Sequence, residues 1–443
     1  MDCLIGLDIG TTAIKGAVMS VDGRVLDTFS GGYNYFGENG TKLLNPSEFL
    51  EVCFSVIKRL AHSLSENDKV VAVCSCCASG NLILLDKDSE PITPIIGWQT
   101  HVDKADIDAF LTEEEQKGFY NIVGWPLGKG FPAAYLIALR THYPEKLDRA
   151  DMVAMSAEYL NFALTGKWGI SHSMGTPFFL IDQEKGEYNI PFLTKLGIDV
   201  DKLPPIYQKG TVLGNVKNEV AESLGLSADT KVVLGSFDHP SGAMGAGVFE
   251  EGEMLLSCGT SWVEFFPVSS REFAISTRGL VDRFMLDGAP YCVMKSITSI
   301  SEKIDALRYH YLGKISHKEF DELAAAAPFG CNGLRFSFTE DDHTLNGEYS
   351  KADIARAIIE SAATILKNNL ESLEKVGLRA ERVTMIGGIS NSLECVKIIS
   401  EVLHRPVRVA NGQASGAIGA AMLAGIGAGL YKNEREAFSV ISK

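Results

Sequence analysis

The stretch Gly6-Leu7-Asp8-Ile9-Gly10-Thr11-Thr12-Ala13-Ile14-Lys15 decides the fold class of this 443-residue chain. It predicts an apolar strand over residues 4–9, a turn over 10–12 and a second strand over 13–19. A Gly-Thr-Thr turn between two strands points consecutive backbone N–H groups into one concavity, and its hydroxyl groups supplement them. Such a nest suits the oxygens of a phosphate group. The alternative is an ordinary tight hairpin turn, because glycine-rich turns are common.

The same pattern recurs in the second half of the chain. A strand over residues 253–258 leads into the turn Gly259-Thr260-Ser261, and a second apolar strand follows over 262–266. Two similar openings, each heading a segment of mixed helices and strands, predict a duplicated α/β architecture. We expect two domains, residues 1–247 and 248–443, which agrees with the usual size of domains.

Local signals place the other elements. Asn45 and Pro46 mark the start of a helix, and Ser156 is expected to cap another helix that ends at Gly166. Periodicity predicts further helices over 131–141, 352–374 and 393–403, and buried strands over 70–76, 231–235 and 383–386.

Composition excludes several functional classes. The chain carries 41 basic and 56 acidic residues, for a net charge of −15. This charge disfavours binding to nucleic acid and to anionic membranes. The uncharged stretch over residues 414–431 is rich in Gly and Ala, so it predicts close helix packing rather than a membrane span.

The cysteines indicate a reducing compartment. The nine cysteines are an odd number, and the sequence begins without the basic and apolar pattern of a targeting peptide. We therefore expect reduced thiols and a cytoplasmic location. Cys74, Cys76 and Cys77 cluster as the ligands of a metal site do, but no second pair of ligands accompanies them, so buried strand cysteines are the better interpretation.

Asp8 is an acid in an otherwise apolar strand, and burying an unpaired carboxylate is costly. It needs a cation, and Mg²⁺ with its waters is the natural partner beside a nucleotide. The sequence has neither a P-loop nor the glycine fingerprint of dinucleotide-binding folds, and it lacks the His-Arg-Asp set of protein kinases. A phosphate-binding protein without these motifs belongs among the actin-like ATPases and sugar kinases.

Five motifs, in order along the chain, resemble those of the FGGY family of carbohydrate kinases. They are residues 6–15 and Gly259-Thr260-Ser261, which resemble two phosphate motifs; residues 235–247, which resemble the segment of the catalytic aspartate; Gly387-Gly388-Ile389-Ser390-Asn391-Ser392, which resembles the adenosine motif; and residues 414–421, which resemble the helix that follows it. The resemblance implies two actin-like (ribonuclease H-like) α/β domains with the active site in a cleft between them.

The resemblance also implies roles for individual residues. Asp238 would be the general base that takes the proton from a sugar hydroxyl, and Asp8 would hold Mg²⁺ through water. The phosphates of ATP would lie against Gly10, Thr11, Thr12, Gly259 and Thr260, and the adenosine against Gly387, Gly388 and Asn391. The expected reaction is ATP-dependent phosphorylation of a small carbohydrate or polyol, with a ketose as the leading candidate.

Four further residues are candidates from their positions. Trp98 could stack on a polyol and Gln99 could hydrogen-bond to it; the alternative is a Trp packed under a loop beside a solvated Gln. His239 follows the expected base and could contact the substrate or cap the next helix. Lys15 could neutralise phosphate charge, although strand alternation also fits an outward position.

Some positions depart from the family pattern and leave alternatives open. The stretch 77–81 is small where many members carry Gln or Arg, and Trp98 is not followed by the usual Asp and Arg. These departures leave the sugar and the phosphorylated hydroxyl undetermined. A non-catalytic nucleotide-binding scaffold, a sugar-sensing regulator and another actin-like phosphotransferase or ATPase stay open, as does assembly into a homodimer.

Overall fold

The computed structural model describes residues 1–442 except 39, 79, 339–344, 346 and 411–413. The first half of the chain forms a six-stranded sheet in the order β13-β14-β5-β1-β2-β3. In this sheet β1 and β2 form an antiparallel hairpin, whereas β1, β5 and β14 are parallel. The strands are β1 (Asp2–Ile9), β2 (Ala13–Ser20), β3 (Val25–Gly32), β5 (Lys69–Cys77), β13 (Val212–Asn215) and β14 (Lys231–Phe237).

The second sheet repeats this arrangement in the order β17-β18-β16-β15-β19-β20. Like β1, strand β15 lies between an antiparallel hairpin partner and a parallel strand. The duplicated α/β architecture expected from the two turns is therefore confirmed. The strands are β15 (Gly252–Cys258), β16 (Trp262–Val268), β17 (Leu280–Arg283), β18 (Tyr291–Ile297), β19 (Ala380–Gly387) and β20 (Val407–Val409).

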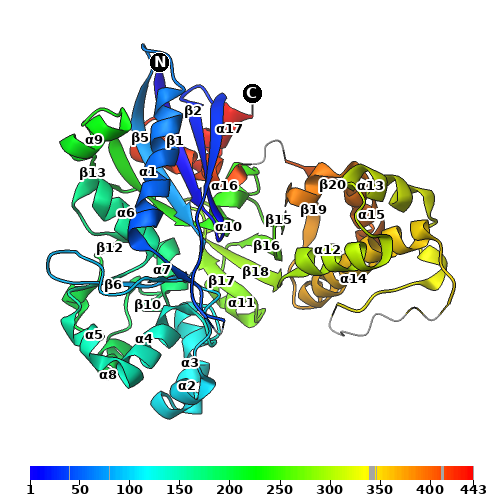
Figure 1. Cartoon of the computed structure of the whole chain (residues 1–443), viewed down its shortest axis with the longest axis horizontal. Helices are drawn as coiled ribbons and strands as arrows, with labels where there is room; N and C mark the ends of the chain where they lie inside the picture. Colours follow the sequence, from blue (N-terminus) through cyan, green and yellow to red (C-terminus); the bar gives the residue numbers. More distant parts are fainter. Residues whose placement is uncertain (39, 79, 339–344, 346, 411–413, 443) are drawn as a thin grey trace.

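Helices cover the first sheet, and a largely helical insertion separates β5 from β13 (Figure 1). The helices of this half are α1 (Pro46–His62), α2 (Lys104–Phe110), α3 (Glu113–Val123), α4 (Phe131–His142), α5 (Pro144–Arg149), α6 (Ser156–Thr165), α7 (His172–Phe178), α8 (Ile190–Leu196), α9 (Asn218–Leu224) and α10 (Asp238–Gly245), with the 3₁₀ turn η1 (Val200–Lys202). Short strands connect them: β4 (Leu43–Leu44), β6 (Ile83–Leu85), β7 (Ile95–Ile96), β8 (Met152–Ala154), β9 (Ile170–Ser171), β10 (Ile181–Asp182), β11 (Glu187–Tyr188) and β12 (Ile206–Tyr207).

Helix starts show where local signals suffice and where they fail. At α1 the Asn45 side chain accepts from the backbone N–H of Ser47 at 2.9 Å, with Pro46 at the first helical position, as expected. At α6 the expected cap is wrong by one residue: Met155 is the N-cap and Ser156 is the first helical residue. The Ser156 N–H and hydroxyl are instead bound by the side chain of Asn81, which tertiary packing brings to it.

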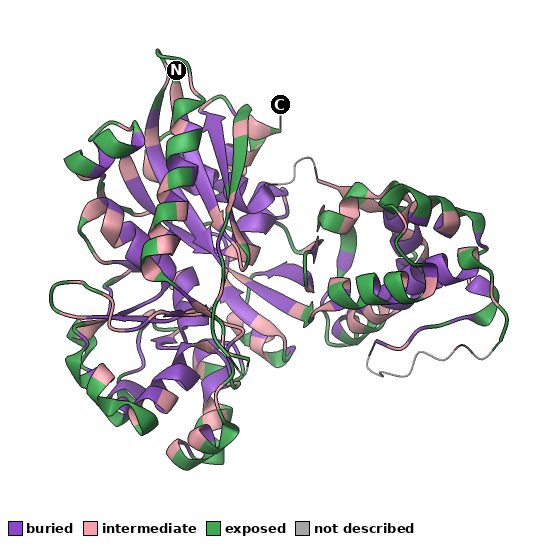
Figure 2. Cartoon of the chain, in the orientation of Figure 1, coloured by how far each residue is buried: buried purple, intermediate pink, exposed green. Residues whose placement is uncertain are grey.

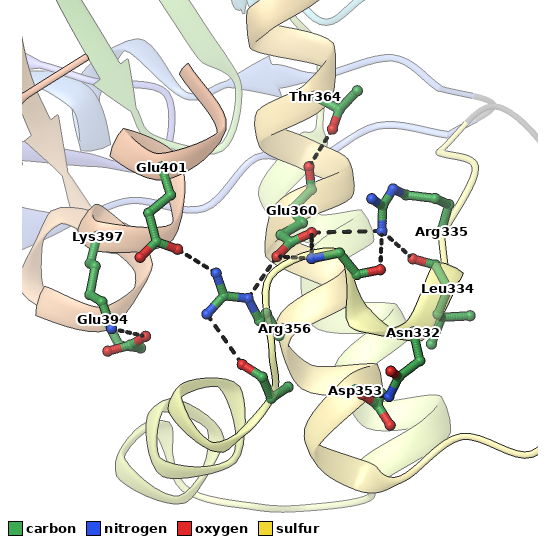
Figure 3. Close-up of polar contacts among 12 residues, drawn as sticks. Asn332, Leu334, Arg335, Asp353, Arg356, Glu360, Thr364, Glu394, Lys397 and Glu401 are labelled. Carbon is green, nitrogen blue, oxygen red and sulfur yellow. Dashed lines mark hydrogen bonds and ion pairs between the residues drawn. The ribbon is translucent and has the colours of Figure 1, made fainter. Parts of the chain in front are cut away.

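The second half has its own core around the long helix α14. Its elements are α11 (Arg271–Ser276), α12 (Ile300–Leu312), α13 (His317–Ala326), η2 (Cys331–Gly333), α14 (Lys351–Lys375), η3 (Gly388–Asn391) and α15 (Leu393–Leu403). Figure 3 shows how α14 is tied to its neighbours: buried Arg356 pairs with Glu360 one turn away at 2.6 Å and with Glu401 of α15. Because Arg356 and Glu360 are both buried and paired with each other, this cluster has a structural role.

The last two helices, α16 (Ser415–Gly427) and α17 (Glu434–Ile441), return to the first sheet. Buried Ala417 and Ala421 of α16 belong to the same hydrophobic core as β1, β5 and β14 (Figure 2). The carboxylate of Glu434 forms a buried ion pair with Lys209, at 3.0 Å. The expected packing of the uncharged stretch is confirmed, and no described helix is long and apolar enough to cross a membrane. The domain boundary at 247/248 stays a prediction.

Helices α10 and α16 approach each other backbone to backbone. A Cβ atom on Gly419 would lie 2.0 Å from the carbonyl oxygen of Ser241, and one on Gly245 would lie 2.0 Å from that of Ser415. Pairing of 241 with 419 and of 245 with 415 shows that the helices run antiparallel. Only glycine fits at these two positions, since the atoms in the way belong to the backbone.

We expect Gly419→Ala to lower the free energy of unfolding by about 1–3 kcal/mol, the usual cost of overpacking a dense core. The matched control is Gly118→Ala in α3, where an added Cβ meets nothing within 4 Å. That change should stabilise the chain by about 0.5–1 kcal/mol, because Ala loses less conformational entropy than Gly in a helix. Thermal denaturation measures both variants, and equal melting temperatures would contradict the packing argument.

Candidate functional site

The turn between β1 and β2 is held in place from two sides. The Gly10 N–H donates to the carbonyl oxygen of Ala13 at 3.1 Å, and the Gly10 carbonyl accepts from the hydroxyl of Tyr33. The Thr11 hydroxyl accepts a hydrogen bond from Nε1 of Trp98 at 3.0 Å. Thr12 is exposed. Trp98 therefore lies directly beside the predicted phosphate turn, although 87 residues separate it from Thr11.

The loop around Trp98 is also fixed. The Tyr135 hydroxyl contacts the carbonyl oxygens of Gly97 and Thr100, each at 3.0 Å. Gln99 lies between them and is half-buried. A cavity of about 20 Å³, large enough for roughly one water molecule, lies between Trp98, the turn at Gly10 and the side chain of Asn81.

Asp8 is half-buried and lies one residue before the end of β1, with buried Ile9 between it and the turn. Burial raises the pKa of its carboxyl to about 6, and the nearby charge of Asp238 raises it further. Lys15 is the register partner of Asp8 on β2, so the two side chains lie on one face of the sheet. The exposed Lys15 ammonium lowers the pKa of Asp8 through its positive charge.

Asp238 follows the last residue of β14 and begins α10. Burial raises the pKa of its carboxyl to about 7, while hydrogen bonds such as that from the His239 N–H, at 2.7 Å, partly offset this effect. The carboxylate does not cap the helix, whose N-cap is Phe237. Burial lowers the pKa of His239 to about 4, so this imidazole is neutral at pH 7.

The second turn, between β15 and β16, is braced by a residue that the sequence analysis missed. The Ser301 hydroxyl donates to the carbonyl oxygen of Gly259 at 2.6 Å, and the Ser301 N–H donates to that of Thr260 at 3.2 Å. Gly259 and Thr260 are exposed. A serine at the start of a helix, 42 residues downstream of Gly259, gives no local signal of this role.

The glycine pair at the end of β19 lies next to this second turn. Gly387 is the register partner of Cys258, the residue before Gly259. Its φ of 101° is left-handed, and a Cβ there would lie 2.2 Å from the Cys258 carbonyl oxygen. Only glycine therefore fits at position 387. Gly388 and Asn391 follow in η3, and both residues are exposed.

The sequence-predicted residues therefore form two groups, one at the edge of each sheet. Helix α10 joins them, because it begins at Asp238 and its Gly242 lies against Ile386, one residue before Gly387. The first turn of α16 also reaches the site: a Cβ on Gly416 would lie 2.6 Å from Oδ2 of Asp8.

A second hollow, larger than the cavity beside Trp98, lies elsewhere. It measures about 920 Å³ and is lined by Trp168, Tyr188 and Tyr207 together with mainly aliphatic side chains. None of the predicted site residues lines it. The chemistry favours the strand ends, where carboxylates of raised pKa meet glycine-rich turns.

The donor set at Asp8 fits Mg²⁺ held through water. Among the described residues, the one hydrogen bond found to this carboxylate is a weak contact from the Cys76 thiol at 3.7 Å. No group of three His, Cys, Asp or Glu side chains within the described ranges could hold a metal. Mg²⁺ usually keeps several waters and needs one or two carboxylates plus phosphate oxygens.

Comparison with known proteins gives the family. Residues 3–245 match the sequence model of the N-terminal domain of the FGGY family of carbohydrate kinases, and residues 321–428 match that of its C-terminal domain. The chain belongs to the FGGY family of carbohydrate kinases. The resemblance expected from the five motifs is thus confirmed, and the chain is a carbohydrate kinase.

Individual relatives agree with this assignment. A xylulose kinase of Staphylococcus epidermidis is 26% identical over 97% of this chain and 89% of its own length. An autoinducer-2 kinase of Klebsiella pneumoniae is 25% identical over 97% of this chain and 87% of its own. The crystal structure of a ligand-bound xylulose kinase from Lactobacillus acidophilus superposes with a TM-score of 0.91, at 22% identity, over 99% of this chain and 92% of that one.

The Trp98–Thr11 bond yields a prediction for this kinase. Trp98→Phe keeps an aromatic ring but removes the N–H donor, which frees the Thr11 hydroxyl and loosens the first turn. A hydrogen bond of this kind contributes about 0.5–1.5 kcal/mol, so we expect the KM for ATP to rise about 2- to 10-fold with a smaller change in kcat. Steady-state kinetics at saturating sugar measure it. An unchanged KM for ATP would show that the turn does not depend on Trp98.

The raised pKa of Asp238 predicts a pH dependence. Asp238 is expected from the sequence to be the general base, which must be ionised to act, so kcat/KM for the sugar should rise with pH and level off above about pH 7. Stability should change in the opposite sense. The folded carboxyls of Asp8 and Asp238 bind protons more tightly than unfolded ones, so their contribution to stability is lost as pH rises through about 6 to 7. A profile of kcat/KM against pH that is flat down to pH 5 would contradict the role of Asp238 as the base.

Proposed function

We propose that this chain transfers the γ-phosphoryl group of ATP to a hydroxyl of a small carbohydrate, with a ketose as the leading candidate and Asp238 as the general base. The observation that carries the proposal is the environment of Asp238. Its half-buried carboxylate, of pKa about 7, lies at the edge of the sheet between β14 and α10, and it forms no ion pair within the described part of the chain. A group poised near neutral pH is suited to accept a proton.

The other residues position the reactants. Backbone N–H groups and hydroxyls of Gly10, Thr11 and Thr12 would hold one part of the triphosphate, and those of Gly259 and Thr260 another. Phosphoryl transfer depends mainly on such positioning and on charge stabilisation. Lys15 would add positive charge on the face that carries Asp8.

Two further groups of residues, one for adenosine and one for the sugar, complete the proposed site. The backbone of Gly387 and Gly388, with Asn391, would bind adenosine, and Trp98, Gln99 and His239 would contact the sugar. Asp8 would hold Mg²⁺ through water, and the bound cation would neutralise phosphate charge. The neutral His239 would serve as a hydrogen-bonding group rather than as a cation.

The proposed substrate class is supported by the relatives, and the proposed cellular location is supported by the cysteines. Xylulose kinases are among the relatives that cover nearly the whole chain, which favours a ketose. The nine cysteines are all free and buried, which suits a reducing compartment, so we place the enzyme in the cytoplasm.

The test is a coupled ADP-release screen across pentuloses, hexuloses, heptuloses, glycerol and other polyols, with Asp238→Asn as the matched variant. Asn keeps the shape of Asp but cannot take a proton, so kcat should fall at least about 100-fold. The melting temperature at pH 8 should stay equal or rise, because a desolvated carboxylate is removed and no helix cap is lost. The Asp8→Asn variant should differ from Asp238→Asn, because high Mg²⁺ concentrations should partly restore its activity.

The outcomes separate the competing functions. ADP release that no sugar raises above the ATP-only background would favour an ATPase, a scaffold or a sugar-sensing regulator. Retention of more than about a tenth of wild-type kcat in Asp238→Asn lies far outside the range for a lost general base. That result would remove Asp238 from this role.

A further inference from the structure

The backbone that carries the proposed base is held by a side chain from the helical insertion of the first half. The N–H of Phe237, the residue before Asp238, donates to the hydroxyl oxygen of Ser173 at 3.2 Å. Ser173 lies on α7, is buried, and is 64 residues away from Phe237 in the sequence. The bond falls where β14 departs from its regular ladder with β5, between Leu234 and Phe237. Ser173 therefore fixes the main chain at a strand end where the sheet is irregular.

A carboxyl group from the second half of the chain orients this hydroxyl. The Ser173 hydroxyl donates to Oδ2 of Asp282, on β17, at 3.2 Å. The other oxygen, Oδ1, accepts from the backbone N–H of Arg283 at 2.7 Å, so both oxygens of Asp282 have donors. Because a hydroxyl has one proton, donation to Asp282 leaves the lone pairs of Ser173 Oγ for the Phe237 N–H. A chain of hydrogen bonds therefore runs from Asp282 through Ser173 to the backbone beside the base.

The Asp282 carboxyl is costly for the fold. It is fully buried, and burial raises its pKa to about 7, although hydrogen bonds, among them one from Thr176, partly offset this effect. Within the described part of the chain it forms no ion pair, since the nearby ammonium group of Lys209 pairs with Glu434. An apolar side chain of similar volume is often as stable or more stable at such a position. Stability therefore does not explain a carboxyl here, whereas a fixed acceptor for Ser173 does.

The ring of Phe237 is fixed by other contacts. It belongs to an aromatic cluster of four rings, those of Trp125, Phe131, Phe179 and Phe237. The Trp125 ring contacts Phe237 edge-on with centroids 5.5 Å apart, and it contacts Phe131 at the same distance. Phe131 and Phe179 stack at 4.9 Å. This packing holds the ring but gives the backbone N–H no partner, and that partner is Ser173.

We propose that Ser173, oriented by Asp282, is a positioning residue for Asp238: its hydroxyl holds the Phe237 backbone and thereby sets the position of the carboxylate that accepts the proton of the sugar hydroxyl. This inference rests on the proposed role of Asp238 as the base. Among the described residues, the hydrogen bonds found to the Asp238 carboxylate come from the N–H groups of Asp238 and His239, which move with it. The position of the base therefore depends on what holds its main chain.

The experiment is a double-mutant cycle between Ser173→Ala and Asp238→Asn, measured as kcat with ATP and the best acceptor of the ADP-release screen, both saturating. Since a displacement of about 1 Å can cost about 100-fold in rate, Ser173→Ala should lower kcat about 10- to 100-fold. The KM for ATP should change less than about threefold, because Ser173 does not hold the phosphate turns. In the Asp238→Asn background no base remains to be positioned, so Ser173→Ala should lower kcat by less than about twofold further.

Two variants of Asp282 test the orientation of the hydroxyl. Asp282→Asn keeps an oxygen that accepts from Ser173, so kcat should stay within about twofold of wild type. Asp282→Ala removes the acceptor, and kcat should fall about 3- to 10-fold, the factor that one hydrogen bond contributes. Melting temperatures show whether each variant folds. Equal kcat values in the two variants would overturn the role given to Asp282.

The matched control is Ser361→Ala on α14. The Ser361 hydroxyl oxygen also accepts from the backbone N–H of a phenylalanine, Phe336, at 3.0 Å, and both residues are buried. Phe336 belongs to the separate core of the second half. The control thus loses the same kind of bond, and its kcat should stay within about twofold of wild type while its melting temperature falls. A fall in kcat as large as that of Ser173→Ala would overturn the inference.

The remaining outcomes separate this inference from the proposed function. If Ser173→Ala lowers kcat by the same factor with and without the carboxylate of residue 238, Ser173 has only a structural role, and the inference is wrong while the kinase function stands. An unchanged kcat in Ser173→Ala has the same meaning. Absence of turnover with every acceptor, or an Asp238→Asn variant that keeps more than about a tenth of wild-type kcat, overturns both the inference and the role of the base on which it rests.

Discussion

The contact between α10 and α16 is the constraint on which the candidate site depends. Helix α10 carries Asp238 at its start, and the first turn of α16 lies against Asp8. The two helices meet through backbone atoms at Gly245 and Gly419, so their separation cannot vary with side-chain rotamers. A shift of α10 would therefore move Asp238, and a shift of α16 would change the packing around Asp8.

This close packing also explains the electrostatics. Gly416 in the first turn of α16 lies against the Asp8 carboxylate and helps to exclude water from it, and burial raises the pKa of both Asp8 and Asp238. Two carboxylates of raised pKa lower the stability of the folded chain at neutral pH. The fold accepts this cost at a functional site, where local rules are most often broken in favour of chemistry.

The sequence predicted what depends on neighbouring residues. The turn at Gly10 follows from the residues on each side of it, whereas the register that pairs Asp8 with Lys15 is known only from the structure. The Asn45 cap and the second turn at Gly259 follow from neighbouring residues as well.

Contacts between distant segments could not be predicted in this way. The bond from Trp98 to Thr11, the support of the second turn by Ser301 and the displaced cap at Ser156 all depend on packing across the chain. The aromatic cluster has the same origin, because its members come from different loops and helices. Ser79, in the stretch that departs from the family pattern, lies outside the described residues.

The return of α16 and α17 to the first sheet affects how the chain folds during synthesis. The ribosome releases β1, β5 and β14 long before these helices, yet α16 supplies part of the same hydrophobic core. Until Glu434 emerges, the ammonium group of Lys209 lacks the carboxylate with which it is buried. The N-terminal half must therefore wait, incomplete and with apolar surface exposed, until the segment that carries α16 and α17 has been translated, which lengthens the interval in which chaperones would act on it.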